Sequence, residues 1–286
     1  MTDAPEYLTV KELAQLLRIK ERKVYDLAAA GDIPCTRATG KLLFPDADVR
    51  AWIDGKQTGT LPQRPKVFLG SHDPLLEWAL RQSDCGLATF FDGSLDGIDR
   101  FLKGEGIAAG LHITDPDTGD WNTPIAARDC AGSDAVLIGW AKRQRGLVCR
   151  DKSIKTLQNV VGRRIAQRKP STGAAALWDH LLKDADIALD AVKNVEECPS
   201  EADAILAVAE DRADVTFGLE AMAHPYNLRV VPLVVERFDL LIDRAAYFEP
   251  AMQTFLKFCQ TDAFRARAQS LKGYDISGLG DIRWNA

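Results

Sequence analysis

The sequence lacks a hydrophobic run of about 18 residues, the length that a membrane-spanning helix needs. Its first residues, Met1–Glu6, lack the basic and apolar regions of a secretory signal peptide. The six cysteines are widely scattered and never form a C-x-x-C pair, which argues against a zinc site and against a compact disulfide framework. We therefore expect a cytoplasmic protein with buried, reduced thiols.

Net charge is also small. A formal net charge of −5 argues against a broadly basic surface that coats nucleic acid, but it leaves room for one small basic face. His180 and His224 fall in no metal-ligand spacing, so no metal site or cofactor is predicted. The adjacent residues Ser71, His72 and Asp73 cannot form a nucleophilic relay, because consecutive side chains point in different directions. Enzyme activity is therefore only a remote alternative.

The chain does contain enough apolar sequence for a sizeable core, since 46% of its 286 residues are apolar and 27% are charged. The stretch 67–79 is the starting point for interpreting the larger part of the chain. A strand-like run ends on Gly70 and Ser71, and Pro74 then begins a segment with helical spacing, so we predict a strand, a tight loop and a helix. Such a loop directs backbone N–H groups, the Ser71 hydroxyl and the positive end of a helix dipole at an anion.

Residues 1–56 predict a helix-turn-helix. Thr9 and Glu12 form a capping-box pattern, and the helix that follows has an apolar stripe made of Leu13, Leu16 and Leu17. A second helix is expected over 21–30, with Gly31 as its end. Near its start, where such a helix usually meets base edges in the major groove, stand four candidate DNA-binding residues: Lys20, Arg22, Lys23 and Tyr25.

A hairpin is expected to follow as a wing. Segments 33–37 and 41–44 flank a turn with Gly40, which would place Arg37 and Lys41 beside DNA phosphates. A closing helix then begins at Pro45-Asp46. The order of these parts, from the stretch 7–14 through 33–34 to 44–53, resembles the excisionase-type, MerR-like winged helix-turn-helix family over about fifty residues. The alternative is that these basic residues form an ordinary solvated helix face.

A linker rich in glycine, proline and polar residues is expected at 57–65, and strands alternating with helices follow. This alternation predicts an α/β fold with parallel sheets whose ligands bind beyond the carboxyl ends of the strands, where Ser71, Ser94 and His112 fall. The basic stretch 142–145 is interpreted as a crossing into a second lobe. Lobe I would hold about 66–144 and 230–286, and lobe II about 145–229. Two strands, 229–235 and 238–243, would return to lobe I.

Lobe II contributes a further anion-binding helix start. A strand at 165–167 leads through Arg168, Ser171, Thr172 and Gly173 into a helix, which supplies two hydroxyls and a cation. Alternatives stay open for several of the site residues. Ser71 and Ser94 would be helix caps, His112 an interior histidine, and Arg168 an ion-pair partner that braces the lobes.

Five motifs carry a second resemblance, namely 70–76, 93–98, 109–124, 168–177 and 213–218. Together they resemble a periplasmic-binding-protein-like sensor family, similar to molybdate- and tungstate-binding proteins, over about two hundred and twenty residues. This sensor is often attached to a helix-turn-helix, which implies a one-component transcription regulator. The sequence departs from the family pattern at 170–173 and at Thr216. The candidate ligand-binding residues are Ser71, His72, Ser94, His112, Arg168, Ser171, Thr172, Gly173 and Thr216.

The hypothesis from the sequence is a DNA-binding homodimer whose effector, molybdate or tungstate, is held by neutral donors between the lobes. Neutral donors hold a dianion without the burial of several full charges. Two alternatives keep the regulator and change the effector to a small organic anion or a molybdenum-containing cofactor. Another alternative is a DNA-bound scaffold with a pocket that binds nothing.

Overall fold

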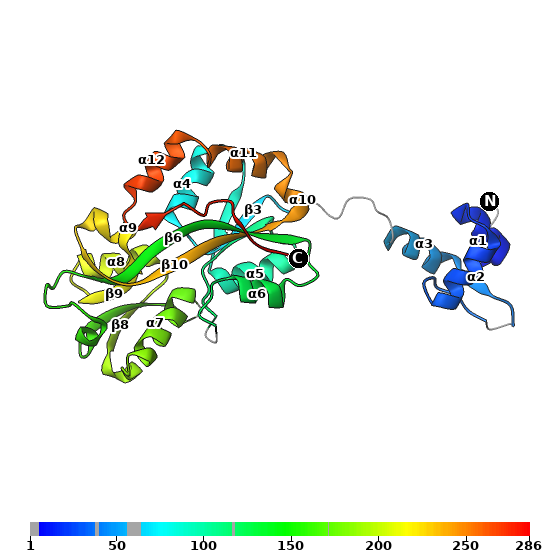
Figure 1. Cartoon of the computed structure of the whole chain (residues 1–286). Helices are drawn as coiled ribbons and strands as arrows, with labels where there is room; N and C mark the ends of the chain where they lie inside the picture. Colours follow the sequence, from blue (N-terminus) through cyan, green and yellow to red (C-terminus); the bar gives the residue numbers. More distant parts are fainter. Residues whose placement is uncertain (1–5, 38–39, 56–63, 116–117, 171) are drawn as a thin grey trace. The chain divides into compact units, whose positions relative to one another are not determined.

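The computed structural model describes residues 6–37, 40–55, 64–115, 118–170 and 172–286 (Figure 1). The chain divides into two compact units, Met1–Gln63 and Arg64–Ala286, which we call the N-terminal and the C-terminal unit. Of the predicted linker, only residues 64 and 65 are described. Arg64 is held by the C-terminal unit, since its guanidinium donates to the carbonyl of Phe101 (2.5 Å) and pairs with Asp243 (2.9 Å).

The N-terminal unit has its own hydrophobic core. Its elements are β1 (Tyr7–Thr9), α1 (Val10–Leu17), α2 (Glu21–Ala30), β2 (Leu43–Pro45) and α3 (Asp46–Gly55). The predicted capping box is confirmed, because the Thr9 hydroxyl accepts from the Glu12 N–H (3.3 Å) and the Glu12 carboxylate accepts from the Thr9 N–H (2.8 Å). Leu13 is buried, but Leu16 is 40% exposed, so its predicted place in the apolar stripe is wrong.

The wing prediction is confirmed where the structure describes it. Thr36 and Leu43 form an antiparallel bridge, and the Gly40 N–H donates to the Arg37 carbonyl (3.0 Å). The two turn residues between them, 38 and 39, lie outside the described residues.

The C-terminal unit is built on a twisted sheet whose main path is β4-β3-β5-β10-β6-β9-β7-β8. The elements of its first part are β3 (Val67–Gly70), α4 (Pro74–Gln82), β4 (Ala88–Phe91), α5 (Ser94–Leu102), β5 (Ala108–Leu111) and α6 (Thr123–Asp129). The middle part consists of β6 (Ala135–Cys149), β7 (Arg164–Arg168), α7 (Gly173–Asp184), β8 (Lys193–Cys198), α8 (Glu201–Ala209), β9 (Val215–Leu219) and α9 (Glu220–Ala223). The last part consists of β10 (Arg229–Asp243), α10 (Arg244–Tyr247), α11 (Pro250–Phe258), α12 (Asp262–Ser270), β11 (Tyr274–Asp275) and β12 (Ile282–Asn285).

Two long antiparallel strands, β6 and β10, connect the two lobes (Figure 1). One end of β10 pairs with β5 of lobe I, and the far end of β6 pairs with β9 of lobe II. Parallel pairs then extend each lobe, β3 with β4 and β5, and β7 with β8 and β9. Each lobe therefore has its own hydrophobic layers on this sheet, around Phe68 and Trp140 in lobe I and around Trp178 and Ile205 in lobe II.

Two interpretations of the sequence are corrected here. Residues 142–145 do cross toward lobe II, but they do so as the middle of β6 and not after a strand that ends at Ala141, and Arg143 and Arg145 are fully buried there. The strands predicted at 229–235 and 238–243 are one strand, β10, whose register shifts at two bulges. Both errors have one cause. Charged residues that are neutralised by distant partners resemble a loop when only neighbouring residues are considered.

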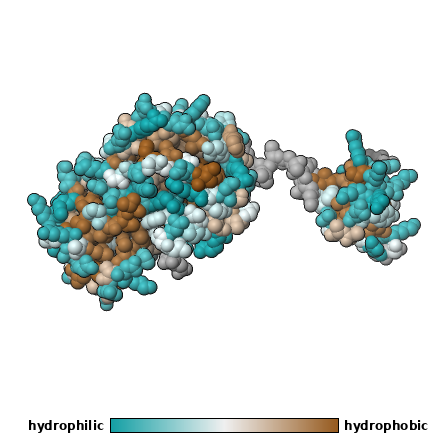
Figure 2. Space-filling view, viewed as in Figure 1, coloured by the Kyte–Doolittle hydropathy of each residue, from teal (hydrophilic) through white to brown (hydrophobic). Residues whose placement is uncertain are grey.

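The surface of the C-terminal unit differs between its lobes. Figure 2 shows a mostly hydrophilic surface over α12 and hydrophobic residues gathered over lobe II.

Among the described helices, none is long and apolar enough to cross a membrane. Of the six cysteines, Cys35 is exposed and the other five are buried as free thiols.

Candidate functional site

The site begins with two serine hydroxyls at the carboxyl ends of adjacent strands. Gly70 has a φ of +91°, and a Cβ there would lie 2.4 Å from the Gly110 carbonyl oxygen, so only glycine lets β3 turn this closely over β5. The next N–H, of Ser71, donates to the same carbonyl (2.8 Å). This turn brings the Ser71 hydroxyl within 2.7 Å of the Ser94 hydroxyl, with only 5% and 1% of the two residues exposed.

The serine pair holds a hydroxyl proton without an acceptor. Ser94 Oγ also accepts from the His112 N–H (3.0 Å). Two hydroxyls carry two protons, and their mutual hydrogen bond uses one of them. The second O–H therefore has no acceptor among the residues that the structure describes, whichever serine donates to the other.

Helix capping does not account for these serines. The cap of α4 is Asp73, whose carboxylate accepts from the Leu76 N–H (2.7 Å). The cap of α5 is Gly93, which makes no side-chain bond, and Ser94 is the first helical residue. The capping alternative is therefore wrong for both serines.

His112 lies where the two lobes meet. It follows β5, and its carbonyl and ring face Gly173, the first residue of α7 in lobe II. A Cβ on Gly173 would lie 3.1 Å from the His112 carbonyl oxygen and 3.4 Å from Cε1. Thr172 caps α7, since its hydroxyl accepts from the Ala175 N–H (3.3 Å). The first N–H groups of α7 thus approach the same region as the serine pair.

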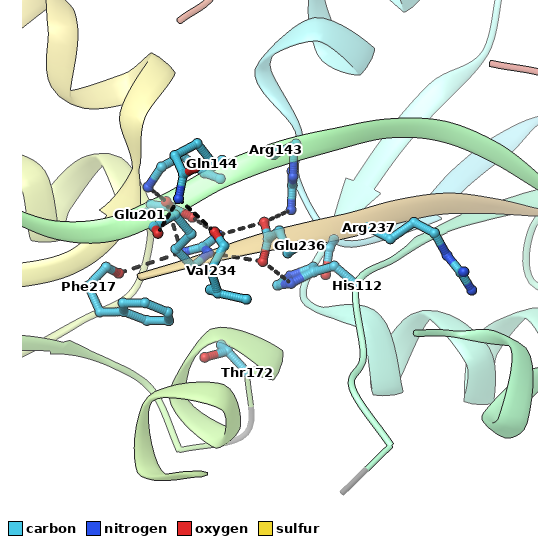
Figure 3. A network of polar contacts seen from close by, with 12 residues as sticks. His112, Arg143, Gln144, Thr172, Glu201, Phe217, Val234, Glu236 and Arg237 are labelled. Atoms are coloured by element: carbon cyan, nitrogen blue, oxygen red, sulfur yellow. Dashed lines mark hydrogen bonds and ion pairs between the residues drawn. The ribbon is translucent and has the colours of Figure 1, made fainter. Parts of the chain in front are cut away.

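A buried network of ion pairs runs behind this region, along β6 and β10 (Figure 3). Arg143 pairs with Asp73 (2.8 Å) of lobe I and with Glu236 of β10, and Arg145 pairs with Glu236 (2.9 Å) and with Glu201 (3.0 Å) of lobe II. Burial opposes the ionisation of Glu236, but the two guanidiniums outweigh it and hold the pKa of Glu236 well below its usual range. Three carboxylates thus neutralise the charges of the two arginines, while the Nε–H of Arg143 has no hydrogen-bond partner among the described residues.

Sequence reasoning missed these network residues. A signal was present, because Arg143 and Arg145 alternate with other residues between two apolar runs, as in a strand with one buried polar face. Their partners are 56 to 93 positions away in the sequence and cannot be paired with them by spacing alone.

The remaining predicted ligand residues separate into two groups. Arg168 donates to the Cys198 carbonyl (3.1 Å) and forms no ion pair within the described part of the chain, so it does not brace the lobes as a salt bridge. Together with Thr216, Ala174 and Trp178 it lines a small pocket in lobe II. The Thr216 hydroxyl itself donates to the Ala166 carbonyl (2.7 Å) inside the sheet.

His72 contacts a residue of α4 and forms no hydrogen bond with either serine of the pair among the described residues. Its Nε2 contacts the Glu77 carboxylate (2.9 Å), and 38% of its side chain is exposed. Ser171 lies outside the described residues.

The predicted DNA-binding residues are all exposed in the N-terminal unit. Lys20 precedes α2, Arg22 and Lys23 lie in its first turn, and Tyr25 is 54% exposed. Arg37 and Lys41 are exposed beside the Thr36–Leu43 bridge. Within the described residues, none of these five cations pairs with a carboxylate, so their charges are available to phosphates.

Comparisons with known proteins agree with both units. Residues 7–57 match a helix-turn-helix domain of the excisionase-like kind, and residues 77–260 match the PBP superfamily domain. The uncharacterised protein YvgK of Bacillus subtilis (strain 168) is 22% identical over 307 residues, covering 99% of each chain.

Two solved structures are similar to the C-terminal part of the chain. An ancestral arginine-binding protein bound to arginine has a TM-score of 0.47 and 15% identity, over 72% of this chain and 97% of that one. The effector-binding domain of QuiR in complex with shikimate has a TM-score of 0.44 and 17% identity, over 70% and 94%. The chain belongs to the PBP superfamily and carries a helix-turn-helix domain before its PBP-like domain.

Proposed function

We propose that the protein is a transcription regulator of the cytoplasm that binds operator DNA as a homodimer and is controlled by a small oxyanion, molybdate or tungstate, between the lobes of its C-terminal unit. The combination of a helix-turn-helix domain with a PBP-like domain supports a ligand-regulated, non-enzymatic regulator. The observation that favours an oxyanion is the buried pair Ser71–Ser94 with its unused hydroxyl proton.

Neutral donors suit this class of ligand. Burying an unpaired charge is costly, whereas hydroxyl and backbone N–H dipoles hold a dianion without the burial of several full charges. The nearby arginines are already neutralised by Asp73, Glu201 and Glu236. The first turns of α5 and α7 add unpaired N–H groups and the positive ends of two helix dipoles. Closure of the lobes on the anion would then change the separation of the two recognition helices in the dimer.

A small organic anion, including a molybdenum-containing cofactor, is the second candidate ligand. Arg168, which forms no ion pair within the described part of the chain, lies beside Trp178 and Phe217 in lobe II, but the pocket that they line has room for only about one water molecule before any opening of the lobe. A cation next to an aromatic wall suits an anionic group attached to a carbon skeleton.

Thermal unfolding of the anion-stripped protein tests the ligand. At a concentration of one hundred times Kd, a ligand adds about 2.7 kcal/mol, which raises the melting temperature of a domain of this size by about 5–11 °C. Molybdate and tungstate should give this shift at matched ionic strength, and sulfate and phosphate should not. Ser71→Ala and Ser94→Ala should lose the shift, and Ser270→Ala, an exposed serine at the end of α12, should keep it. Stabilisation by none of the four anions would make an organic anion the leading candidate.

DNA binding is tested by selection of an operator from random duplexes, followed by titration with and without molybdate. Arg22→Ala and Lys23→Ala should weaken binding and reduce its salt dependence. Two half-sites about 34 Å apart would fit a dimer, and sedimentation of the free protein reports whether the dimer exists. Operator affinity that is the same with and without any anion would favour a scaffold instead of a regulator.

A further inference from the structure

His112 contacts three separate parts of the site. Its backbone N–H donates to Ser94 Oγ (3.0 Å), its carbonyl and ring lie against Gly173 of lobe II, and its ring Nδ1 faces Glu236 Oε2 at 3.3 Å. The ring also stacks on Phe238, with centroids 6.0 Å apart and planes 15° apart. Only 7% of the residue is exposed. The ring thus contacts the start of α7 and the ion-pair network of Figure 3, while the backbone N–H of the same residue contacts the serine pair.

The charged groups that act on the ring come from the two long strands. Glu236 lies on β10, and Arg143 and Arg145 lie on β6, whereas α5 presents the Ser94 hydroxyl and α7 presents backbone N–H groups. Burial lowers the pKa of the His112 imidazole, the two arginines lower it further, and Glu236 opposes them. The ring is accordingly neutral near pH 7 when no ligand is bound. Nδ1 lies 3.3 Å from Glu236 Oε2, which favours the neutral tautomer with its proton on Nδ1 and an unprotonated Nε2.

Resting on the function proposed above, we propose that binding of the oxyanion at the serine pair adds one proton to His112, so that the protein senses the anion and the proton together. The proton comes from the buffer and goes to Nε2, and no other bond forms or breaks. The imidazolium then donates through Nδ1 to Glu236 and through Nε2 toward the anion. An anion within about 4–6 Å favours the charged form of histidine, which is the physical basis of the uptake.

The linkage has a defined sign. His112 is neutral in the free protein and protonated in the complex, so protons and anion strengthen each other's binding. Affinity for molybdate should rise as the pH falls from 8 to 6. The rise should reach about tenfold per pH unit between the free and the bound pKa of His112.

Isothermal titration of the full chain with molybdate tests the proposal. Two buffers of equal pH and ionic strength but different ionisation heats, such as Mops and imidazole, report the number of protons taken up. We expect about one proton per bound anion near pH 7. His112→Gln keeps the backbone N–H and a side-chain donor but cannot be charged, so its uptake should be zero and its affinity independent of pH. His180→Gln is the matched control, because His180 is a half-buried histidine of α7 paired with Asp184 (3.2 Å), and its uptake should equal that of the unaltered protein.

The outcomes separate this inference from the function on which it depends. Molybdate binding with the same heat in both buffers would overturn proton uptake and leave the oxyanion site intact. Uptake that persists in His112→Gln would overturn the assignment to His112. If none of molybdate, tungstate, sulfate and phosphate binds, both proposals fail. The two-buffer measurement on the unaltered protein is decisive even if His112→Gln does not fold.

Discussion

Replacement of Glu236 by glutamine should strongly destabilise the C-terminal unit. Glu236 is fully buried and accepts from Arg143 and from Arg145. Glutamine keeps the volume and one acceptor but removes the charge that both guanidiniums share. Breaking a buried ion pair costs about 3–5 kcal/mol. Because Arg143 keeps Asp73 and Arg145 keeps Glu201, we expect the lower end, about 3 kcal/mol.

For a domain of this size, that loss lowers the melting temperature by about 6–12 °C. Tryptophan fluorescence follows the unfolding, and one of the six tryptophans, Trp140, belongs to the same network, since its indole N–H donates to the Asp73 carboxylate (3.0 Å). Glu105→Gln is the control, because Glu105 makes an exposed pair with Arg100 (2.6 Å) and such pairs contribute little. A shift for Glu236→Gln as small as that of the control would refute the view that these buried charges depend on one another.

Three further predictions concern two substitutions and one labelling experiment. Thr9→Ala removes the capping box of α1 and should cost the N-terminal unit about 1 kcal/mol in chemical unfolding, while the unfolding of the C-terminal unit stays unchanged. Gly173→Ala places a Cβ 3.1 Å from the His112 carbonyl, so it should keep the lobes apart and weaken anion binding at least several-fold in titration, and unchanged affinity would show that the lobes do not meet there. In alkylation followed by mass spectrometry at pH 8, Cys35 should react first, because it is exposed, whereas burial raises the pKa of Cys130 to about 11. Equal labelling of the two thiols would contradict their burial.

Local signals in the sequence were sufficient for most elements. The caps at Thr9 and Gly31 predicted the bounds of α1 and α2, and the run of strand, small residue and helix placed Ser71 and Ser94 at adjacent strand ends. These features depend on neighbours within a few residues, which is the range over which backbone preference and capping act.

The strands that were predicted wrongly contain charged residues whose partners are distant in the sequence. The sequence predicted a strand that ends at Ala141, before the charged middle of β6, and it did not predict β8 with its acidic residues. Whether Arg143 lies in a strand or a loop depends on Asp73 and Glu236, which are 70 and 93 residues away. One sequence without its relatives does not contain that pairing. The orientation of His72 toward Glu77 could not be predicted either, since alternate side chains after a strand face opposite ways only while the strand continues.

The hydrogen bond from the Tyr274 hydroxyl to Asp73 (2.6 Å), which joins residues 201 positions apart, sets an order of events during protein synthesis. The N-terminal unit has its own core within Leu8–Ile53 and can fold while the ribosome is still adding the rest. The buried arginines of β6 gain their partner Glu236 only once β10 has been synthesised, and Asp73 gains its partner Tyr274 only with β11. The C-terminal unit is therefore completed late in translation. A chain whose synthesis stops before β10 would therefore retain a folded helix-turn-helix and lack the unit that binds the ligand.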